Sequence, residues 1–374
     1  MIKKLLLGVL AVACISCSET TAVKLLNVSD FEAEVDGKEV SLYTLKSGDL
    51  TMQVTNFGAR VVTLWVPDKS GHHEDVVLGY NNLENYVNNP GERFLGAVVG
   101  PYANRIAGGT YTIDEETYHF PQNNNGQTLH GGLKGLDMVV WDVDSVTDNA
   151  IVFSFLCPDG HDGMPGNRKI VMTYTLTPEN EFKVDYVAET DKATHMNISH
   201  HSFFNLKGEG NGTINDHVLY INASKTTPVD AVLIPTGEIA DVTGTPFDFR
   251  EPKTIGRDLD VENDQLTNGA GYDHNWILDR VSANEIELAA AVHEPTSGRY
   301  MEVWTDQPAI QFYGGNFFDG STYGKYGKTL NYRESIALET QKYPDSPHHA
   351  HFPSTLLNPG ETYTHTCIYK FTTR

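Results

Sequence analysis

Apolar and polar residues alternate with a period of two along most of the chain. Leu50, Met52 and Val54 are separated by Thr and Gln, and residues 151–156 show the same alternation. In an extended strand, successive side chains point to opposite faces of the sheet, so this pattern predicts β-strands.

One hairpin is predicted with particular clarity. Its first strand covers residues 170–176, the turn is Thr-Pro-Glu-Asn at residues 177–180, and the second strand covers residues 182–186. Helical periodicity is limited to short stretches such as residues 81–87, and the 33 Gly and 17 Pro fall mainly between strand candidates. Strands without crossover helices predict an all-β fold, a large antiparallel β-sandwich.

The first residues have the layout of a bacterial signal peptide. Lys3 and Lys4 precede an apolar run, Leu5–Ile15, which is too short for a membrane span and ends among small residues and cysteines. The end of this run is similar to a lipoprotein box. We expect lipidation at Cys17, although Cys14 and an ordinary secretory signal without lipid remain alternatives.

The chain is therefore divided as follows. Residues 1–17 are the predicted signal peptide with its lipoprotein box, residues 18–40 a tether and N-terminal extension, and residues 41–374 one catalytic domain, because no linker or repeat interrupts them. We expect an exported protein, periplasmic or anchored in the outer membrane of a Gram-negative-type bacterium, that contacts the membrane only through a lipid.

Charge and cysteine content exclude several functions. A formal net charge of −22, without any cluster of Lys and Arg, argues against nucleic acid as a partner. Cys157 and Cys367 are the only cysteines after the predicted leader, and no CxxC spacing indicates structural zinc. Free thiols are the favoured interpretation, with a disulfide between them left open.

Five polar segments interrupt the apolar alternation, each beside turn residues or at a strand end. They are GPYANRIAGG (100–109), QTLHGG (127–132), NISHHSFFNL (197–206), GYDHNWIL (271–278) and ALETQKYPDSP (337–347). In this order they resemble the aldose 1-epimerase (galactose mutarotase) family, and the likeness extends from about Leu42 to the C-terminus. The resemblance implies a galactose mutarotase-like supersandwich with its site on the concave face of one sheet.

The resemblance also implies an activity, the interconversion of the α and β anomers of free aldohexoses such as glucose and galactose. Ring opening needs a base for the proton of the C1 hydroxyl and an acid for the ring oxygen. The family's base matches Glu339, and its acid matches His201. Since the two roles exchange during reclosure, no cofactor is expected, and no metal.

Further matches concern sugar binding. The positions that match the family's substrate-binding residues, or lie directly beside its acid, are Asn104, Arg105, His130, Ser202, Phe203, Asp273 and Gln311. Arg105 has a structural salt bridge as its alternative interpretation, and Asp273 a turn-capping role.

The chain departs from the commoner family pattern at two positions, with His200 in place of Asn and Phe203 in place of Tyr. His200 and His201 must face opposite sides of an extended segment, so we expect only one of them to reach the sugar. We assign the acid to His201.

Other candidates are weaker. Tyr102, Trp276 and Phe317 offer flat apolar surfaces for a sugar, but aromatic residues on strands usually belong to a core. The histidines of residues 348–351 suggest zinc, yet no acidic or sulfur ligand has a fitting spacing, so we expect an exposed loop.

Three rival functions use the same residues. A glycoside hydrolase would pair Asp273 with Glu339, and a carbohydrate-binding protein would bind a sugar without turnover. A sugar-phosphate epimerase would need more than Arg105 around the phosphate. The preferred aldose is left open, as is the choice between monomer and homodimer.

Overall fold

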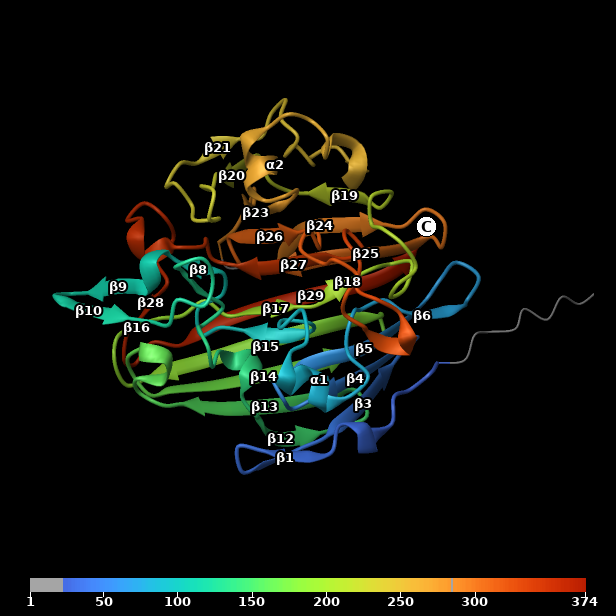
Figure 1. Ribbon diagram of the computed structural model, residues 1–374, viewed down its shortest axis with the longest axis horizontal. Helices are drawn as coiled ribbons and strands as arrows, with labels where there is room; N and C mark the ends of the chain where they lie inside the picture. The colour runs from blue at the N-terminus through green and yellow to red at the C-terminus, as the bar shows by residue number, and fades with distance from the viewer. Residues whose placement is uncertain (1–22, 284) are drawn as a thin grey trace, which may run out of the picture.

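The computed structural model describes residues 23–283 and 285–374. The predicted signal peptide and Cys17 lie outside this part of the chain. Within the described residues, the largest sheet has nine antiparallel strands, which follow one another across Figure 1. In spatial order they are β12 (Asp142–Val146), β13 (Ala150–Cys157), β14 (Arg168–Leu176), β15 (Glu181–Thr190), β29 (Tyr363–Thr373), β25 (Arg299–Thr305), β24 (Glu287–His293), β19 (Val218–Ile221) and β22 (Lys253–Thr254).

Two smaller sheets complete the main framework. One has the order β18 (Phe203–Phe204), β27 (Ile336–Gln341), β26 (Ala309–Tyr313), β23 (Asp273–Ile277), β20 (Lys225–Thr227) and β21 (Ala240–Asp241). The other has the order β3 (Leu42–Ser47), β4 (Leu50–Thr55), β5 (Arg60–Pro67) and β6 (His73–Asp75). All strand pairs in both sheets are antiparallel.

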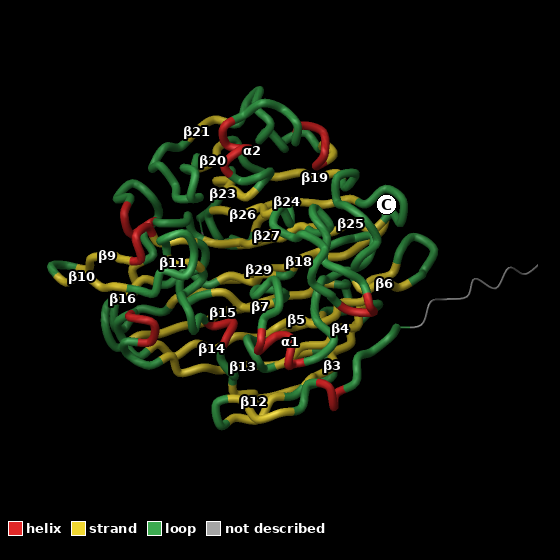
Figure 2. Tube along the Cα trace, in the orientation of Figure 1, coloured by secondary structure: helices red, strands yellow, loops and turns green. Residues whose placement is uncertain are grey.

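Short ribbons and helical turns connect these sheets, as Figure 2 shows. The paired short strands are β1 (Ala33–Val35) with β2 (Lys38–Val40), β7 (Ala97–Val99) with β17 (Ser199–His201), β8 (Arg105–Ile106) with β11 (Thr128–Leu129), β9 (Thr110–Ile113) with β10 (Glu116–His119), and β16 (Thr194–His195) with β28 (Leu356–Leu357). The α-helices are α1 (Leu83–Asn88) and α2 (Asp264–Asn268), and the 3₁₀ turns are Val28–Asp30, Ala107–Gly109, Leu136–Met138, His161–Gly163, Ile255–Asp258, Lys325–Gly327 and Ser346–His348.

The core lies between the nine-stranded sheet and the six-stranded sheet, and the four-stranded sheet also contributes residues to it. The rings of Phe204 on β18 and Tyr369 on β29 are 5.0 Å apart, and the Tyr369 hydroxyl donates to the carbonyl of Leu338 on β27 at 3.0 Å. Ile336 and Leu338 point into this same apolar cluster. The predicted antiparallel β-sandwich is therefore confirmed.

Local predictions agree with the observed elements. The predicted hairpin is β14–β15, in which Leu176 pairs with Phe182 and Met172 with Tyr186. The short helical stretch is α1, whose first turn is capped by the Asn82 side chain accepting from the N–H of Asn85.

The polar face of β4 differs from a simple surface face. Gln53 is 1% exposed, and its side-chain amide exchanges hydrogen bonds with the backbone of Leu26. Residues of the N-terminal extension therefore pack on this sheet: Phe31 is fully buried, and the β1–β2 hairpin follows it.

Two other features concern cysteines and membranes. Cys157 and Cys367 are buried and unpaired, as favoured from the sequence. Among the described residues, no helix has the length and apolarity needed to cross a bilayer.

Candidate active site

The six-stranded sheet has one face in the apolar core and an opposite face that is polar. On β27, Ile336 and Leu338 enter the core, so Glu339 points to the opposite face. Gln311 on β26 is the register partner of Glu339, and Asp273 begins the adjacent strand β23. Alternation along three neighbouring strands thus places two carboxylates and an amide side by side.

His201 reaches the same region from β17. The residue before it on that strand, His200, faces the other way. His200 lies among the rings of Tyr174, Phe182 and Tyr369, and its Nδ1 is 3.1 Å from the Tyr174 hydroxyl. Burial lowers the pKa of His200 to about 3, so this imidazole is a neutral part of the core. The structure thus separates the adjacent histidines as strand alternation requires.

Asn104, Arg105 and His130 come from two tight turns joined by the β8–β11 ribbon. Asn104 and His130 have φ values of 61° and 51°, and the backbone N–H of Asn104 donates to Nδ1 of His130 at 3.0 Å. Gly131, with φ of 86°, follows, and a Cβ there would collide with the carbonyl oxygen of Gly100. The glycine after His130 therefore allows this turn to approach the segment that carries Asn104.

These groups surround a pocket of about 490 Å³, a volume suited to a small ligand. Its lining comprises Asn89, Gly91, Glu92, Arg93, Phe94, Asn104, Arg105, Asn123, Asn124, Leu129, His130, Leu133, His201, Phe203, Asp273, Tyr313, Phe317 and Glu339. Most of the candidate residues from the sequence therefore meet in one place, although they come from segments far apart in the chain.

His201 and Glu339 form the central contact, with His201 Nε2 3.3 Å from Glu339 Oε1. Burial raises the pKa of the Glu339 carboxyl well above its usual value; Asp273 raises it further, and Arg105 opposes both. Burial lowers the pKa of His201 to about 3. Both directions favour neutral side chains in the pocket, a carboxylic acid beside a neutral imidazole.

A chain of polar contacts runs away from this pair. Gln311 Nε2 donates to Asp273 Oδ1 at 2.7 Å, and Arg105 Nη2 lies 3.9 Å from Asp273 Oδ2. Burial raises the pKa of Asp273, and the charge of Arg105 and the Gln311 hydrogen bond partly offset this rise. The Asp273 carboxylate is thereby aligned to accept from hydroxyl groups in the pocket.

His130 completes the site as a hydrogen-bond donor. Its Nδ1 already accepts from a backbone N–H, so in the neutral ring Nε2 carries the proton. Burial lowers the pKa of His130 well below its usual value, which keeps the ring neutral.

The same tautomer bears on metal binding. Potential ligand atoms of His130, His201 and Glu339 all lie within 4.8 Å of one another, and two histidines with a glutamate are a known zinc set. A protonated Nε2 on His130 has no lone pair for a metal, so this donor set fits hydrogen bonding and proton transfer.

The remaining candidates are divided between the pocket lining and positions outside it. Ser202 does not line it, because its hydroxyl contacts Nε2 of His200 at 2.7 Å on the core side. Gln311 contributes through Asp273, while Phe203 and Phe317 are in the lining. Tyr102 and Trp276 are fully buried, each inside an apolar cluster.

The histidine-rich loop also has a defined place. His348 and His349 both lie beside Asp345, at 2.6 Å and 3.5 Å, and His351 is exposed.

Sequence reasoning missed one wall of the pocket. Glu92, Arg93 and Phe94 line it, as do Asn123 and Asn124. Arg93 makes two hydrogen bonds to Asp137, and Glu92 accepts from the N–H of Phe94 at 2.9 Å. Nothing local marks this loop as functional, and only its position after α1 brings it to the pocket.

The fold is a two-layer antiparallel sandwich, and its open pocket combines an imidazole–carboxyl pair with several groups that can bind hydroxyls. These are the features of an enzyme that acts on a sugar by acid–base catalysis. Residues 41–370 match the family model for aldose 1-epimerase. The chain belongs to the aldose 1-epimerase family.

Relatives over nearly the whole chain agree. The galactose mutarotase of Bos taurus is 43% identical over 332 residues, which is 89% of this chain and 94% of that protein. The aldose 1-epimerase of Escherichia coli (strain K12) is 34% identical over 339 residues, 90% of this chain and 96% of that protein.

Solved structures show the same fold. A GalM/aldose epimerase homologue from C. elegans superposes with a TM-score of 0.82 at 28% identity, covering 89% of this chain and 99% of its own. The galactose 1-epimerase of Lactobacillus acidophilus NCFM has a TM-score of 0.79 at 29% identity, covering 92% and 97% of the two chains.

Proposed function

We propose that this protein interconverts the α and β anomers of free aldohexoses such as glucose and galactose, with Glu339 as the base and His201 as the acid. Aldose 1-epimerase activity follows from membership of the family, and the proposal concerns the substrates and the residue roles. The observation that carries it is the 3.3 Å contact between His201 Nε2 and Glu339 Oε1 inside the pocket. The two oxygens that exchange protons, O1 and the ring oxygen, share one carbon, so the groups serving them must be close neighbours.

The reaction requires one transferable proton on this pair. Ionised Glu339 takes the proton of the C1 hydroxyl, while protonated His201 gives its proton to the ring oxygen as the C1–O5 bond breaks. The pair is then neutral, and the open-chain aldehyde turns about C1–C2. Reclosure on the other face returns both protons and restores the starting pair.

The desolvated pocket assists the opening step. Burial raises the pKa of Glu339 and lowers the pKa of His201, so proton transfer toward Glu339 and away from His201 is favoured. Arg105 opposes the rise for Glu339 and thereby keeps the ionised carboxylate accessible at the start of the cycle.

The remaining polar groups bind the sugar hydroxyls. Asp273 accepts from two neighbouring hydroxyls, with Gln311 and Arg105 holding its orientation. His130 donates its Nε2–H near the ring or anomeric oxygen, and Asn104 contributes from the adjacent turn. These roles rest on the burial and convergence of the groups around one pocket.

Polarimetry tests the function. Freshly dissolved α-D-glucose and α-D-galactose are followed to equilibrium with and without purified protein lacking residues 1–17. We expect relaxation that accelerates in proportion to enzyme and ends at the same rotation, and the two rates rank the sugars. Unchanged relaxation with every common aldose would refute the proposal, and release of sugar from a glycoside would favour a hydrolase.

We also propose that residues 1–17 direct export, that Cys17 carries a lipid, and that residues 18–40 connect this anchor to the catalytic domain at residues 41–374. The support is the charged, apolar and cysteine-containing order of the leader. Labelled fatty acid should enter the wild-type chain in cells and be absent from Cys17→Ala. Label that persists in this variant would move the anchor to Cys14, and no label in the wild type would leave a plain secretory signal.

A further inference from the structure

Asp345 does not line the pocket, but it binds the segment that carries Arg105, which does. It follows β27, the strand that carries Glu339, and the residue is 1% exposed. Its φ value is 55°, a left-handed conformation that Asn and Asp adopt more readily than most residues. A buried carboxylate in this conformation requires specific partners.

Two of its partners belong to the segment that carries Arg105. The Asp345 backbone N–H donates to the carbonyl of Arg105 at 3.0 Å, and Asp345 Oδ1 accepts from the N–H of Ala107 at 2.8 Å. The next residue repeats the contact, because the N–H of Ser346 donates to the Tyr102 hydroxyl at 3.0 Å. The loop after β27 therefore holds residues 102–107 from outside the pocket.

This attachment matters because the ladder that pairs β8 is short. The strand is two residues long, Arg105–Ile106, and its only ladder partner among the described residues is the equally short β11. Asp345 binds the backbone on both sides of Ile106. The position of the Arg105 guanidinium against Asp273 then depends on these bonds as well as on its own side-chain contacts.

Two imidazoles of its own loop also lie beside the Asp345 carboxylate. His348 Nδ1 lies 2.6 Å from Oδ1, and His349 Nε2 lies 3.5 Å from Oδ2. The carboxylate thus has imidazole partners in its own loop and a backbone partner in the Arg105 segment, so it links the two.

We infer that Asp345 is a positioning residue that acts through Arg105, fixing the backbone of residues 105–107 so that the guanidinium stays aligned with Asp273 and the bound sugar. The inference rests on the proposed function of the pocket. It assigns Asp345 no contact with the sugar and no proton transfer.

The first test compares two replacements with different chemistry. Asp345→Asn tolerates the left-handed φ and keeps an oxygen for the N–H of Ala107, whereas Asp345→Gly tolerates the same φ and removes the acceptor. We expect Asp345→Gly to raise KM for galactose by about 10-fold or more, with a smaller fall in kcat. Asp345→Asn should remain within about 3-fold of wild type.

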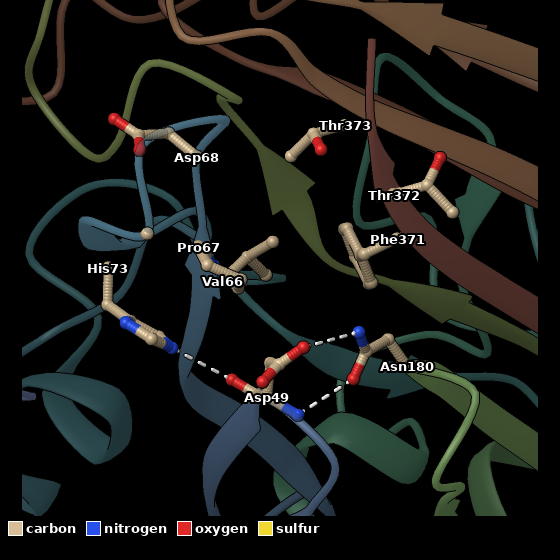
Figure 3. A pocket seen from close by; sticks show the side chains of 10 residues that line it. Asp49, Val66, Pro67, Asp68, His73, Asn180, Phe371, Thr372 and Thr373 are labelled. Atoms are coloured by element: carbon tan, nitrogen blue, oxygen red, sulfur yellow. Dashed lines mark hydrogen bonds between the residues drawn. The ribbon is translucent and has the colours of Figure 1, made fainter.

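The matched control is Asp68, another carboxylate beside a histidine. Asp68 Oδ1 accepts from the N–H groups of Ser70 and His72, and Oδ2 is 3.8 Å from His72 Nδ1. It lines a second pocket, shown in Figure 3, which shares no residue with the pocket around Glu339. Asp68→Gly should lower the melting temperature without changing KM or kcat.

A double-mutant cycle decides whether the effect passes through Arg105. If it does, Asp345→Gly should change KM by less than about 2-fold in an Arg105→Ala background, because the group that it positions is gone. Equal effects in both backgrounds would overturn the inference. So would a lower melting temperature in Asp345→Gly with kcat and KM of wild type.

Sugar binding measured without turnover separates this inference from the proposed function. Galactose affinity is determined by calorimetry for wild type, Asp345→Gly and Asp345→Asn. If the wild type binds galactose without accelerating mutarotation, the proposed function fails, and weaker binding by Asp345→Gly alone would still support the positioning role. Equal affinities in all three proteins would contradict it.

Discussion

Two histidine–carboxylate pairs lie in neighbouring parts of this molecule, and their surroundings differ. The pocket pair is His201 with Glu339, at 3.3 Å, and the anchor pair is His348 with Asp345, at 2.6 Å. Burial lowers the pKa of His201 to about 3, whereas a hydrogen bond with Asp345 raises the pKa of His348 against the effect of its partial burial.

The difference comes from solvent and from partners. In the pocket pair, Glu339 Oε2 and His201 Nδ1 have no hydrogen-bond partner within the described chain, and both side chains are at most 5% exposed. In the anchor pair, Asp345 accepts from a backbone N–H and the His348 side chain is 34% exposed. A desolvated and unsatisfied histidine–carboxyl pair is therefore suited to the proton transfer proposed for the pocket, whereas a hydrogen-bonded pair is suited to an ion pair.

Disruption of the pocket pair should have the largest effect. Glu339→Gln and His201→Asn each should lower kcat by about 10²–10⁴, because each removes a group that exchanges a proton in the transition state. Polarimetry of freshly dissolved sugar gives the rates, and circular dichroism checks that the variants fold. Wild-type turnover in either variant would show that its role is assigned wrongly.

Loss of the Asp273 support should have an intermediate effect. Gln311→Leu removes the donor to Asp273 Oδ1 and should raise KM by about 10-fold, with a smaller change in kcat. Gln307 is the matched control, because it is also buried and donates to a neighbouring aspartate, Asp306, at 2.8 Å. A similar KM change in Gln307→Leu would mean that the effect is general destabilisation.

The pH profile should report the desolvation of the pocket pair. One transferable proton is needed, so kcat/KM should fall at low pH when both groups are protonated and at high pH when neither is. The pKa of His201, about 3, sets the acid limit, and the raised pKa of Glu339 sets the alkaline limit. We expect a broad plateau between them. A narrow optimum with limits near 4.3 and 6.5, the ordinary values, would contradict the desolvated pair.

Disruption of the anchor pair should have the smallest effect, and this effect is on the stability of the protein. The folded pKa of His348 is raised above its unfolded value, so its contribution is fully present below about pH 6.5 and is lost as pH rises through the folded pKa. His348→Gln should lower the free energy of unfolding by about 0.5 kcal/mol at pH 5.5, since the pair is partly exposed, and by less at pH 9. Urea titrations at both pH values measure this, and a gap that widens with pH would have the wrong sign.

Much of the fold was predictable because strand formation follows a local pattern. The β14–β15 hairpin and the orientation of Glu339 both follow from alternation with a period of two. The polar segments supply eight of the 18 residues that line the pocket, and both members of the pocket pair are among them. Ser202 shows the limit, because alternation from His201 already turns its side chain to the core.

The loop that contains Glu92 shows why the rest could not be predicted. Its sequence resembles an ordinary exposed turn, and its place in the pocket depends on long-range contacts, such as the Phe94 ring against the rings of His130 and His201. Asp345 is a similar case, because its carboxylate accepts a hydrogen bond from the backbone N–H of Ala107, which lies 238 positions away in the chain. Such contacts between distant segments leave no periodic signal.

The sequence by itself determined the strand pattern, the sandwich and the family likeness on which the proposed acid, base and hydroxyl-binding residues rest. Those properties depend on residue type and on the alternation of neighbouring side chains. Only the tertiary structure decided which side chains share the pocket, which nitrogen of His130 carries the proton, and which of two histidine–carboxylate pairs is desolvated. These depend on distance and solvent exclusion, which arise when segments far apart in the chain pack against one another.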